Sequence, residues 1–171
     1  MTDPSPADVP HPFGLPATTH AYLDRAAGSL REAITATDVP ARYACAHVAA
    51  LRAAAALLAA RARPAPARRR PQKNAWVLLV EVAPELEEWA RFFAAGAAKR
   101  AAAEAGSTRA VSEREADDLV RDADRFLAVV EQALGLVPHP PLGDRVAVAR
   151  PAPGTVPGHA PDGTGWGTRV S

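Results

Sequence analysis

An arginine and a histidine lie five positions apart near the start of an alanine-rich stretch, as Arg42 and His47. Histidine is the commonest general acid or base in enzymes, and arginine can bind a phosphate group through two parallel hydrogen bonds. On one continuous helix, five residues advance about 500°, so the two side chains would point about 140° apart. Both could face one substrate only if Arg42 lay in a frayed first turn or a second subunit supplied half of the site.

His47 also has a purely structural interpretation. It shares an apolar helical stripe with Tyr43 and Leu51, which is the pattern of a helix face turned toward a core. A histidine in that position is expected to be partly buried and hydrogen-bonded by a neighbouring helix. We favour this interpretation over catalysis, and keep Arg42 and His47 as the candidate catalytic pair of an enzyme hypothesis.

A second candidate site is a cluster of six cations within thirteen residues that contain no acid. Its members are Arg61, Arg63, Arg68, Arg69, Arg70 and Lys73. Prolines in and next to the cluster predict a loop, and such a loop could contact a phosphate backbone. The alternative is a solvated loop in a chain whose alanine and arginine usage is typical of a GC-rich genome. Trp76 could stack on a base beside it, although its helical register favours the core.

Metal and cofactor chemistry find little support in the spacing of the remaining residues. The five histidines and the single cysteine show no His-x3-His, Cys-x2-Cys or Glu-x2-His pattern, so no zinc or di-iron site is expected. We find neither a glycine-rich phosphate loop followed by a helix nor a nucleophile elbow. The prediction is that the protein uses no metal and no cofactor, and that Cys45 is a small buried hydrophobe.

Composition bounds the organisation of the chain and its location. Prolines gather at both ends, which predicts disorder over residues 1–16 and 137–171 and one folded domain over residues 17–136. Within residues 137–171, Trp166 lies between two glycines and is either a docking motif or, as we favour, part of an unstructured tail. The net charge of +1 indicates no general attraction to nucleic acid or membrane. Without an apolar run of transmembrane length or a signal peptide, a cytoplasmic protein with no membrane contact is expected.

Apolar residues recur at helical spacing in four regions, and no region alternates with period two. The first helix is expected to begin at a threonine N-cap, Thr18 or Thr19, and to end near Ala36, and the second to run from the N-cap Asp38 to a stop at Pro64. The third region spans about Asn74 to Ala105, with a kink or split at Pro84 and a stop at Gly106. The last helix begins at a capping box, Ser112–Glu115, and ends at Gly135. The fold class that follows is all-α, a bundle of four to five helices.

Three of these segments resemble the HEPN superfamily, in particular a small actinobacterial branch of it. They are ARYACAHVAALRAAAALLAAR, WVLLVEVAPELEEWARFFAAGAAKR and VSEREADDLVRDADRFLAVVEQAL. Together with the first helix they cover about residues 18–136. The resemblance implies a helical bundle that commonly dimerises and often has RNA as its target.

Active members of that superfamily are metal-independent endoribonucleases with an Arg-x4-6-His motif late in the fold. There the histidine is expected to act as general base or acid, and the arginine to stabilise phosphate charge. This chain has no histidine between Arg100 and Val137, and its Arg42–His47 spacing falls in an early helix. The resemblance therefore implies a non-catalytic member that binds RNA, DNA or a protein partner. The alternatives are an endoribonuclease that uses Arg42 and His47 across a homodimer, and an interaction adaptor such as an accessory to DNA repair.

Overall fold

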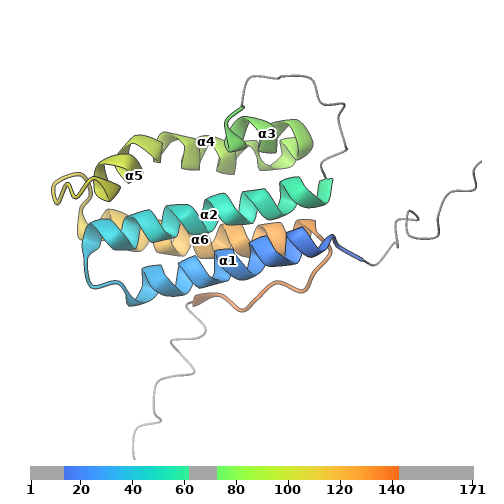
Figure 1. The fold of residues 1–171 in the computed structure, drawn as a ribbon, viewed down its shortest axis with the longest axis horizontal. Coiled ribbons are helices and arrows are strands. Elements are labelled where there is room, and N and C mark those ends of the chain that lie inside the picture. Colours follow the sequence, from blue (N-terminus) through green and yellow to red (C-terminus); the bar gives the residue numbers. More distant parts are fainter. Residues whose placement is uncertain (1–13, 62–72, 143–171) are drawn as a thin grey trace, which may run out of the picture.

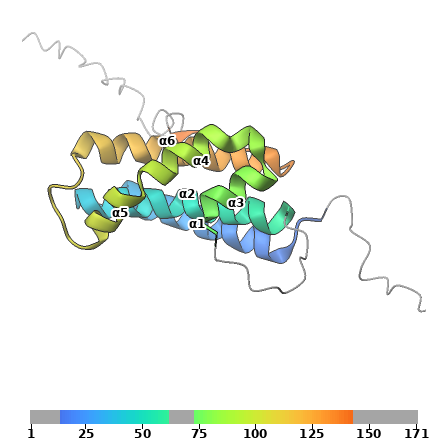
Figure 2. The same ribbon diagram turned by 90° about the horizontal axis from the view of Figure 1, so that it is seen from above.

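The computed structural model describes residues 14–61 and 73–142, and within these residues it is all-α, as predicted. The helices are α1 (Ala17–Thr35), α2 (Val39–Arg61), α3 (Ala75–Val82), the 3-10 turn η2 (Pro84–Leu86), α4 (Glu87–Ala95), α5 (Ala97–Glu104) and α6 (Glu113–Ala133). Antiparallel α1 and α2 lie side by side and α6 packs against both (Figure 1). The chain from α3 to α5 crosses the remaining face of α2, which Figure 2 shows from above. Because α4 and α5 are nearly continuous, the arrangement is the expected bundle of four to five helices.

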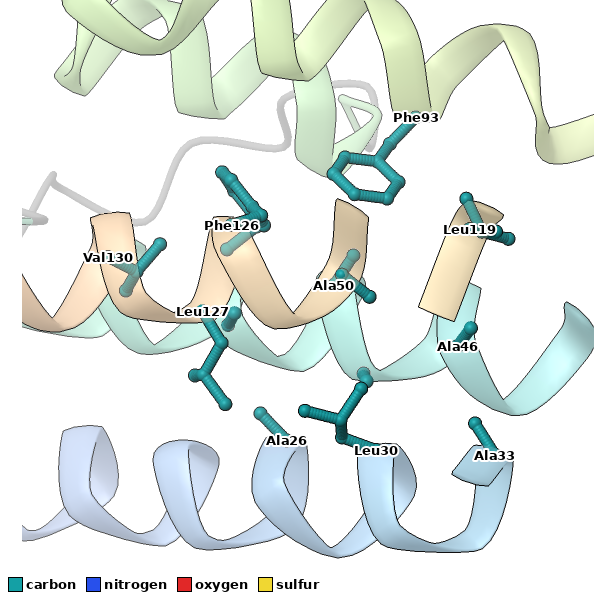
Figure 3. Packing of buried hydrophobic residues seen from close by; sticks show 14 of the residues in the cluster. Ala26, Leu30, Ala33, Ala46, Ala50, Phe93, Leu119, Phe126, Leu127 and Val130 are labelled. Carbon is teal, nitrogen blue, oxygen red and sulfur yellow. The ribbon is translucent and has the colours of Figure 1, made fainter. Parts of the chain in front are cut away.

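The alanines of α2 allow its neighbours to approach closely. Ala46, Ala50 and Ala54 are fully buried, and α2 makes extensive contacts with both α1 and α6. Figure 3 shows the larger side chains of the flanking helices filling the space that the alanines leave, with Leu30 from α1 and Leu127 from α6. A helix of small residues in the middle of a bundle thus keeps the core densely packed.

By length and composition alone, α2 could cross a membrane, which differs from the expectation that no segment is long and apolar enough. Half of that apolar stretch is buried inside the bundle. The central helix of a folded domain has the same composition for a different reason, because it contacts other helices on several sides. Its apolar character is therefore accounted for by α1, α3, α5 and α6.

The start of α1 differs from the prediction of a threonine N-cap. The helix begins at Ala17 after Pro16, and no side chain caps it. Thr19 lies in the first turn of the helix and is fully buried, and its hydroxyl has no hydrogen-bond partner among the described residues. Proline ends the preceding extended chain and fixes where the helix can begin, so the threonine contributes to packing instead of capping.

The start of α2 follows the prediction. The Ala41 backbone N–H donates to Asp38 Oδ2 at 2.9 Å, and Pro40 lies in the first turn of the helix. An aspartate at the N-cap satisfies a backbone donor that has no partner within the helix, and a proline there sacrifices no hydrogen bond. Only three residues, 36–38, separate α1 from α2.

The long third region divides twice. At Pro84 the helix stops and η2 follows, as the proline predicted. The second break, at Gly96 between α4 and α5, was not predicted. Alanine-rich sequence surrounds Gly96 and carries no proline or polar cap, so the local sequence gives little sign of a bend.

The last helix has the predicted ends. The Ser112 side chain accepts a hydrogen bond from the Glu115 backbone N–H, and the Glu115 carboxylate accepts one from the Ser112 N–H, which completes the capping box. At the other end Gly135 has a φ of 75°. Its N–H donates to the Gln132 carbonyl, and that of Leu136 donates to the Glu131 carbonyl, as in a Schellman motif. Gly106 ends α5 in the same way, with a φ of 84°.

Residues 137–142, which the prediction placed in a disordered tail, are described by the structure as a largely exposed segment in which only His139 and Leu142 are half-buried. They fold back along α6, where the Leu142 N–H donates to Asp124 Oδ2 at 3.0 Å and His139 contacts two acidic side chains. Proline content alone suggested disorder, but the histidine and leucine between and after the prolines supply anchors. The rest of the predicted tail, with Trp166, and residues 1–13 lie outside the described residues.

Candidate functional site

His47 is a core residue at the junction of α2 with α4. Its side chain is 1% exposed, and its Nε2–H donates to the Phe93 carbonyl oxygen at 2.8 Å. That carbonyl belongs to the last turn of α4, just before the bend, and it also accepts the Gly96 backbone N–H at 3.1 Å. The hydrogen bond from a neighbouring helix is the one that the structural interpretation of His47 expected.

The surroundings of His47 favour its neutral form. Burial lowers its pKa below the ordinary value of 6.5, the hydrogen bond to Phe93 partly offsets this, and the positive charge of Arg100 lowers it further. Since Nε2 carries the proton, Nδ1 is an acceptor, and it has no partner among the described residues. A histidine held in this way is an uncharged donor inside the core.

Arg42 does not face the same neighbours as His47. Its guanidinium donates to Asp117 Oδ1 of α6 at 2.5 Å and to the Ala36 carbonyl at the end of α1 at 3.2 Å. These contacts fasten the first turn of α2 to two other helices. Within the chain, the residues with nuclease-like spacing therefore serve two separate helix–helix contacts, as the angle of about 140° between them indicated.

Tyr43 and His47 together form the surface on which the bend at Gly96 rests. A Cβ atom on Gly96 would lie 2.9 Å from Tyr43 Oη and 3.3 Å from His47 Cδ2, so a side chain there would force Tyr43 to shift. Burial raises the pKa of the Tyr43 phenol. Beyond the bend, Lys99 forms an ion pair with Glu115 of α6, which raises the pKa of Lys99 and lowers that of Glu115 to about 2.

A groove of about 400 Å³ opens beside this junction, between α4 and α6. Its apolar lining includes Tyr43, Phe92 and Leu119, and Phe92 is 46% exposed. The charged residues on its rim are already paired, for example Arg121 with Asp118 and Arg125 with Asp122. Sequence patterns did not indicate this groove, because its lining comes from four helices and no single segment carries its pattern.

The two ends of the basic cluster are engaged with acids. Arg61 donates to Glu85 Oε1 at 2.6 Å and to the carbonyls of Val82 and Ala133, which ties the end of α2 to η2 and to the end of α6. Lys73 forms an ion pair with Glu81. The other four members, Arg63, Arg68, Arg69 and Arg70, lie outside the described residues.

Trp76, which follows the cluster, belongs to the core. It is 4% exposed, and its ring stacks on that of Phe93 with centroids 5.3 Å apart. The ring centroids of Phe93 and Phe126 are 5.2 Å apart, and Figure 3 shows Phe93 projecting from α4 toward α6. Aromatic rings thus join the outer helices to the core, and Trp76 is not presented to a base.

Metal ligation has no evident site in the part of the chain that the structure describes. No group of three histidine, cysteine, aspartate or glutamate side chains there is arranged to hold an ion. Cys45 is half-buried on α2, where burial raises the pKa of its thiol, so the thiol form is favoured over the reactive thiolate. His20 is exposed on α1.

Comparison with known proteins gives one match. Neither the curated proteins nor the solved structures contain a significant relative of this chain. The profile of the SAV_6107-like HEPN family matches residues 33–131, which is more than half of the chain. The match spans the region from the end of α1 to nearly the end of α6, and so includes His47, the bend at Gly96 and the capping box. The chain therefore belongs to the HEPN superfamily, in its SAV_6107-like family.

Proposed function

We propose that this HEPN domain is a non-catalytic module that binds RNA or DNA. The observation that carries the proposal is that His47 is buried in the core and donates its one ring N–H to the Phe93 carbonyl. A general base or acid must reach the proton that it transfers, and a side chain 1% exposed is not accessible to a polynucleotide. Arg42, engaged by Asp117, offers no free guanidinium to a phosphate beside it.

Binding is assigned to the four arginines of the basic cluster that lie between its two anchored ends. Arg61 and Lys73 hold those ends against acids of η2 and α3, so their charges are largely neutralised. Arg63, Arg68, Arg69 and Arg70 add four positive charges to a segment with no acid, and guanidinium groups bind phosphate oxygens in pairs. The contact would be with the backbone and would carry little sequence preference.

The salt dependence of binding tests this assignment. A fluorescently labelled single-stranded RNA and a DNA of the same sequence are titrated with the protein at several salt concentrations, using anisotropy. Changing Arg68, Arg69 and Arg70 to alanine should reduce the slope of log affinity against log salt by about 0.7 for each phosphate that an arginine no longer neutralises. The matched control changes Arg114, Arg121 and Arg125, which lie on the exposed face of α6, and should leave the slope nearly unchanged.

Two outcomes would contradict the proposal. An unchanged slope in the first variant would show that the basic cluster is not the contact surface. If neither polymer binds at low salt, the domain acts through a protein partner instead, and the groove beside Phe92 becomes the surface to examine.

A further inference from the structure

An open pocket of about 320 Å³ lies between α4 and the middle of α6. Four residues line it: Glu88, Trp89 and Phe92 of α4 and Asp122 of α6. Positions three and four apart on a helix face the same side, so Phe92 lies beside both Trp89 and Glu88. Phe92 and Asp122 also line the larger groove described above, so the two hollows adjoin. The pocket thus presents two aromatic rings and two carboxylates.

The two rings of the pocket form a right-angled corner. The planes of Trp89 and Phe92 meet at 88°, with ring centroids 6.4 Å apart. Trp89 also stacks nearly parallel on Phe93, at 16° with centroids 6.0 Å apart, and its ring lies 5.5 Å from that of Phe126. Because Phe93 and Phe126 are fully buried, they hold the indole in place before any ligand arrives, which lowers the entropy lost on binding. Phe92 remains 46% exposed.

The two carboxylates of the pocket are not fully compensated. Glu88 is exposed, and its carboxylate has no ion pair or hydrogen bond with the described residues, whereas its neighbour Glu87 is paired with Arg91. Asp122 accepts a hydrogen bond from Arg125 at 3.3 Å through Oδ1, which leaves its Oδ2 without a donor in the described part of the chain. A cation in the pocket would therefore meet one unpaired carboxylate and one free carboxylate oxygen.

This combination of groups favours an organic cation over other ligands. The face of an aromatic ring carries negative charge density and attracts a cation that lies within about 6 Å of its centroid, and tryptophan does so most strongly. The two carboxylates repel an anion and add nothing to the binding of a neutral apolar molecule. A metal ion needs more oxygen ligands, and no group of three ligating side chains is found among the described residues. An alkylated ammonium has both a positive charge and an apolar surface that fits against the rings.

We propose that the corner between Trp89 and Phe92 is a binding site for an alkylated ammonium group. The cation lies between the two rings, and Glu88 supplies the balancing negative charge. A free molecule such as choline and the methylated lysine side chain of a protein both carry this chemistry, and the test below separates the two sources. The site goes beyond the nucleic-acid binding proposed above and does not depend on it, because no residue of the basic cluster lines the pocket.

Titration of the full chain with choline at constant ionic strength, followed by NMR, tests the site. The indole N–H signal of Trp89 should shift as the pocket fills, while that of the buried Trp76 should stay in place. The neutral analogue of choline, in which carbon replaces the nitrogen, should bind at least about fivefold more weakly. A short peptide with trimethyllysine is the second probe. Tighter binding of the peptide than of choline would assign the ligand to a protein side chain, and equal binding would assign it to a free ammonium compound.

Variants assign the effect to the residues of the pocket. Phe92→Leu and Glu88→Gln should each weaken choline binding by about threefold to tenfold. The matched controls are Glu87→Gln, at an acid that already has a partner, and Tyr22→Leu, at a half-buried aromatic residue of α1; both should bind choline as the unchanged protein does. Choline binding that is unchanged in Glu88→Gln would overturn the proposal. So would equal affinity for choline and its neutral analogue, or an unmoved Trp89 signal, and both of these are measured on the unchanged protein.

Discussion

At the scale of single residues, Gly96 decides how α4 and α5 can lie on α2. Its missing side chain leaves the space that Tyr43 Oη occupies, and the Phe93 carbonyl beside the bend accepts hydrogen bonds from both His47 Nε2 and the Gly96 N–H. Gly96 therefore acts as one joint with Tyr43 and His47, which lie about fifty positions earlier in the sequence. The joint is formed by the same stretch of α2 that carries the nuclease-like spacing.

The substitution Gly96→Ala should lower the free energy of unfolding by about 1–3 kcal/mol, because its Cβ would lie 2.9 Å from Tyr43 Oη. Urea unfolding measures this loss. Adding Tyr43→Phe, which removes the hydroxyl, should recover part of it, and the double-mutant cycle gives the coupling.

Gly28→Ala is the matched control for this substitution. Gly28 lies inside α1, and the atom nearest to its added Cβ is Arg31 Nη2 at 3.9 Å. Alanine there should stabilise the protein by about 0.5–1 kcal/mol. Equal effects at the two glycines would refute a steric role for Gly96.

His47 should make the stability depend on pH in a defined direction. Because burial lowers its pKa, the unfolded chain takes up a proton near the ordinary value of 6.5 while the folded protein stays neutral. The free energy of unfolding should therefore fall as pH drops from about 7 to about 5. Urea unfolding at several pH values, compared between the unchanged protein and His47→Gln, measures this contribution.

Substitution of His47 should remove that slope. His47→Gln keeps a donor for the Phe93 carbonyl and should cost less stability than His47→Ala, which we expect to lose about 3 kcal/mol. A slope that survives in His47→Gln, or an alanine variant as stable as the unchanged protein, would mean that His47 is not a buried neutral donor.

At the scale of the elements, the capping box of Ser112 and Glu115 satisfies backbone and side-chain groups at the start of α6. Ser112→Ala should lower the free energy of unfolding by about 1 kcal/mol. Ser107→Ala is the control, because Ser107 is exposed and none of the helix-end hydrogen bonds uses its side chain. Equal losses in the two variants would argue against the cap.

Glu115 adds a second pH dependence, which also lowers stability as the pH falls but has a different cause from that of His47. Its pKa is lowered to about 2, first by the hydrogen bond from Lys99 and then by those from Ser112. Its stabilising contribution is therefore present above the ordinary value of 4.5 and is lost as pH falls toward 2.

The sequence predicts an element well where the residues that determine it are close together in the chain. Asp38, Pro84, Ser112 and Gly135 act on their own backbone neighbours, so their effects follow from local sequence. The bend at Gly96 depends on side chains of α2, and the path of residues 137–142 depends on Asp124 and Glu131 of α6, so no short local pattern contains either. The same holds for His47: its helical phase predicted burial, but its partner Phe93 lies 46 positions away.

At the scale of the whole molecule, three cationic side chains join helices of the bundle to one another. Arg42 joins α2 to α6, Arg61 joins it to η2 and α6, and Lys99 joins α5 to α6. The cations that the sequence offered for chemistry or binding are thus structural wherever the structure describes them. For nucleic-acid contact this leaves the middle of the basic cluster, on which the proposed function rests.

The most direct test is one titration of end-labelled RNA with the protein in EDTA, with each sample run on a native and a denaturing gel. The account predicts a salt-sensitive shift on the native gel and full-length RNA on the denaturing gel, both unchanged in His47→Gln. Shortened RNA with the unchanged protein, and intact RNA with His47→Gln, would contradict it and establish His47 as a catalytic residue.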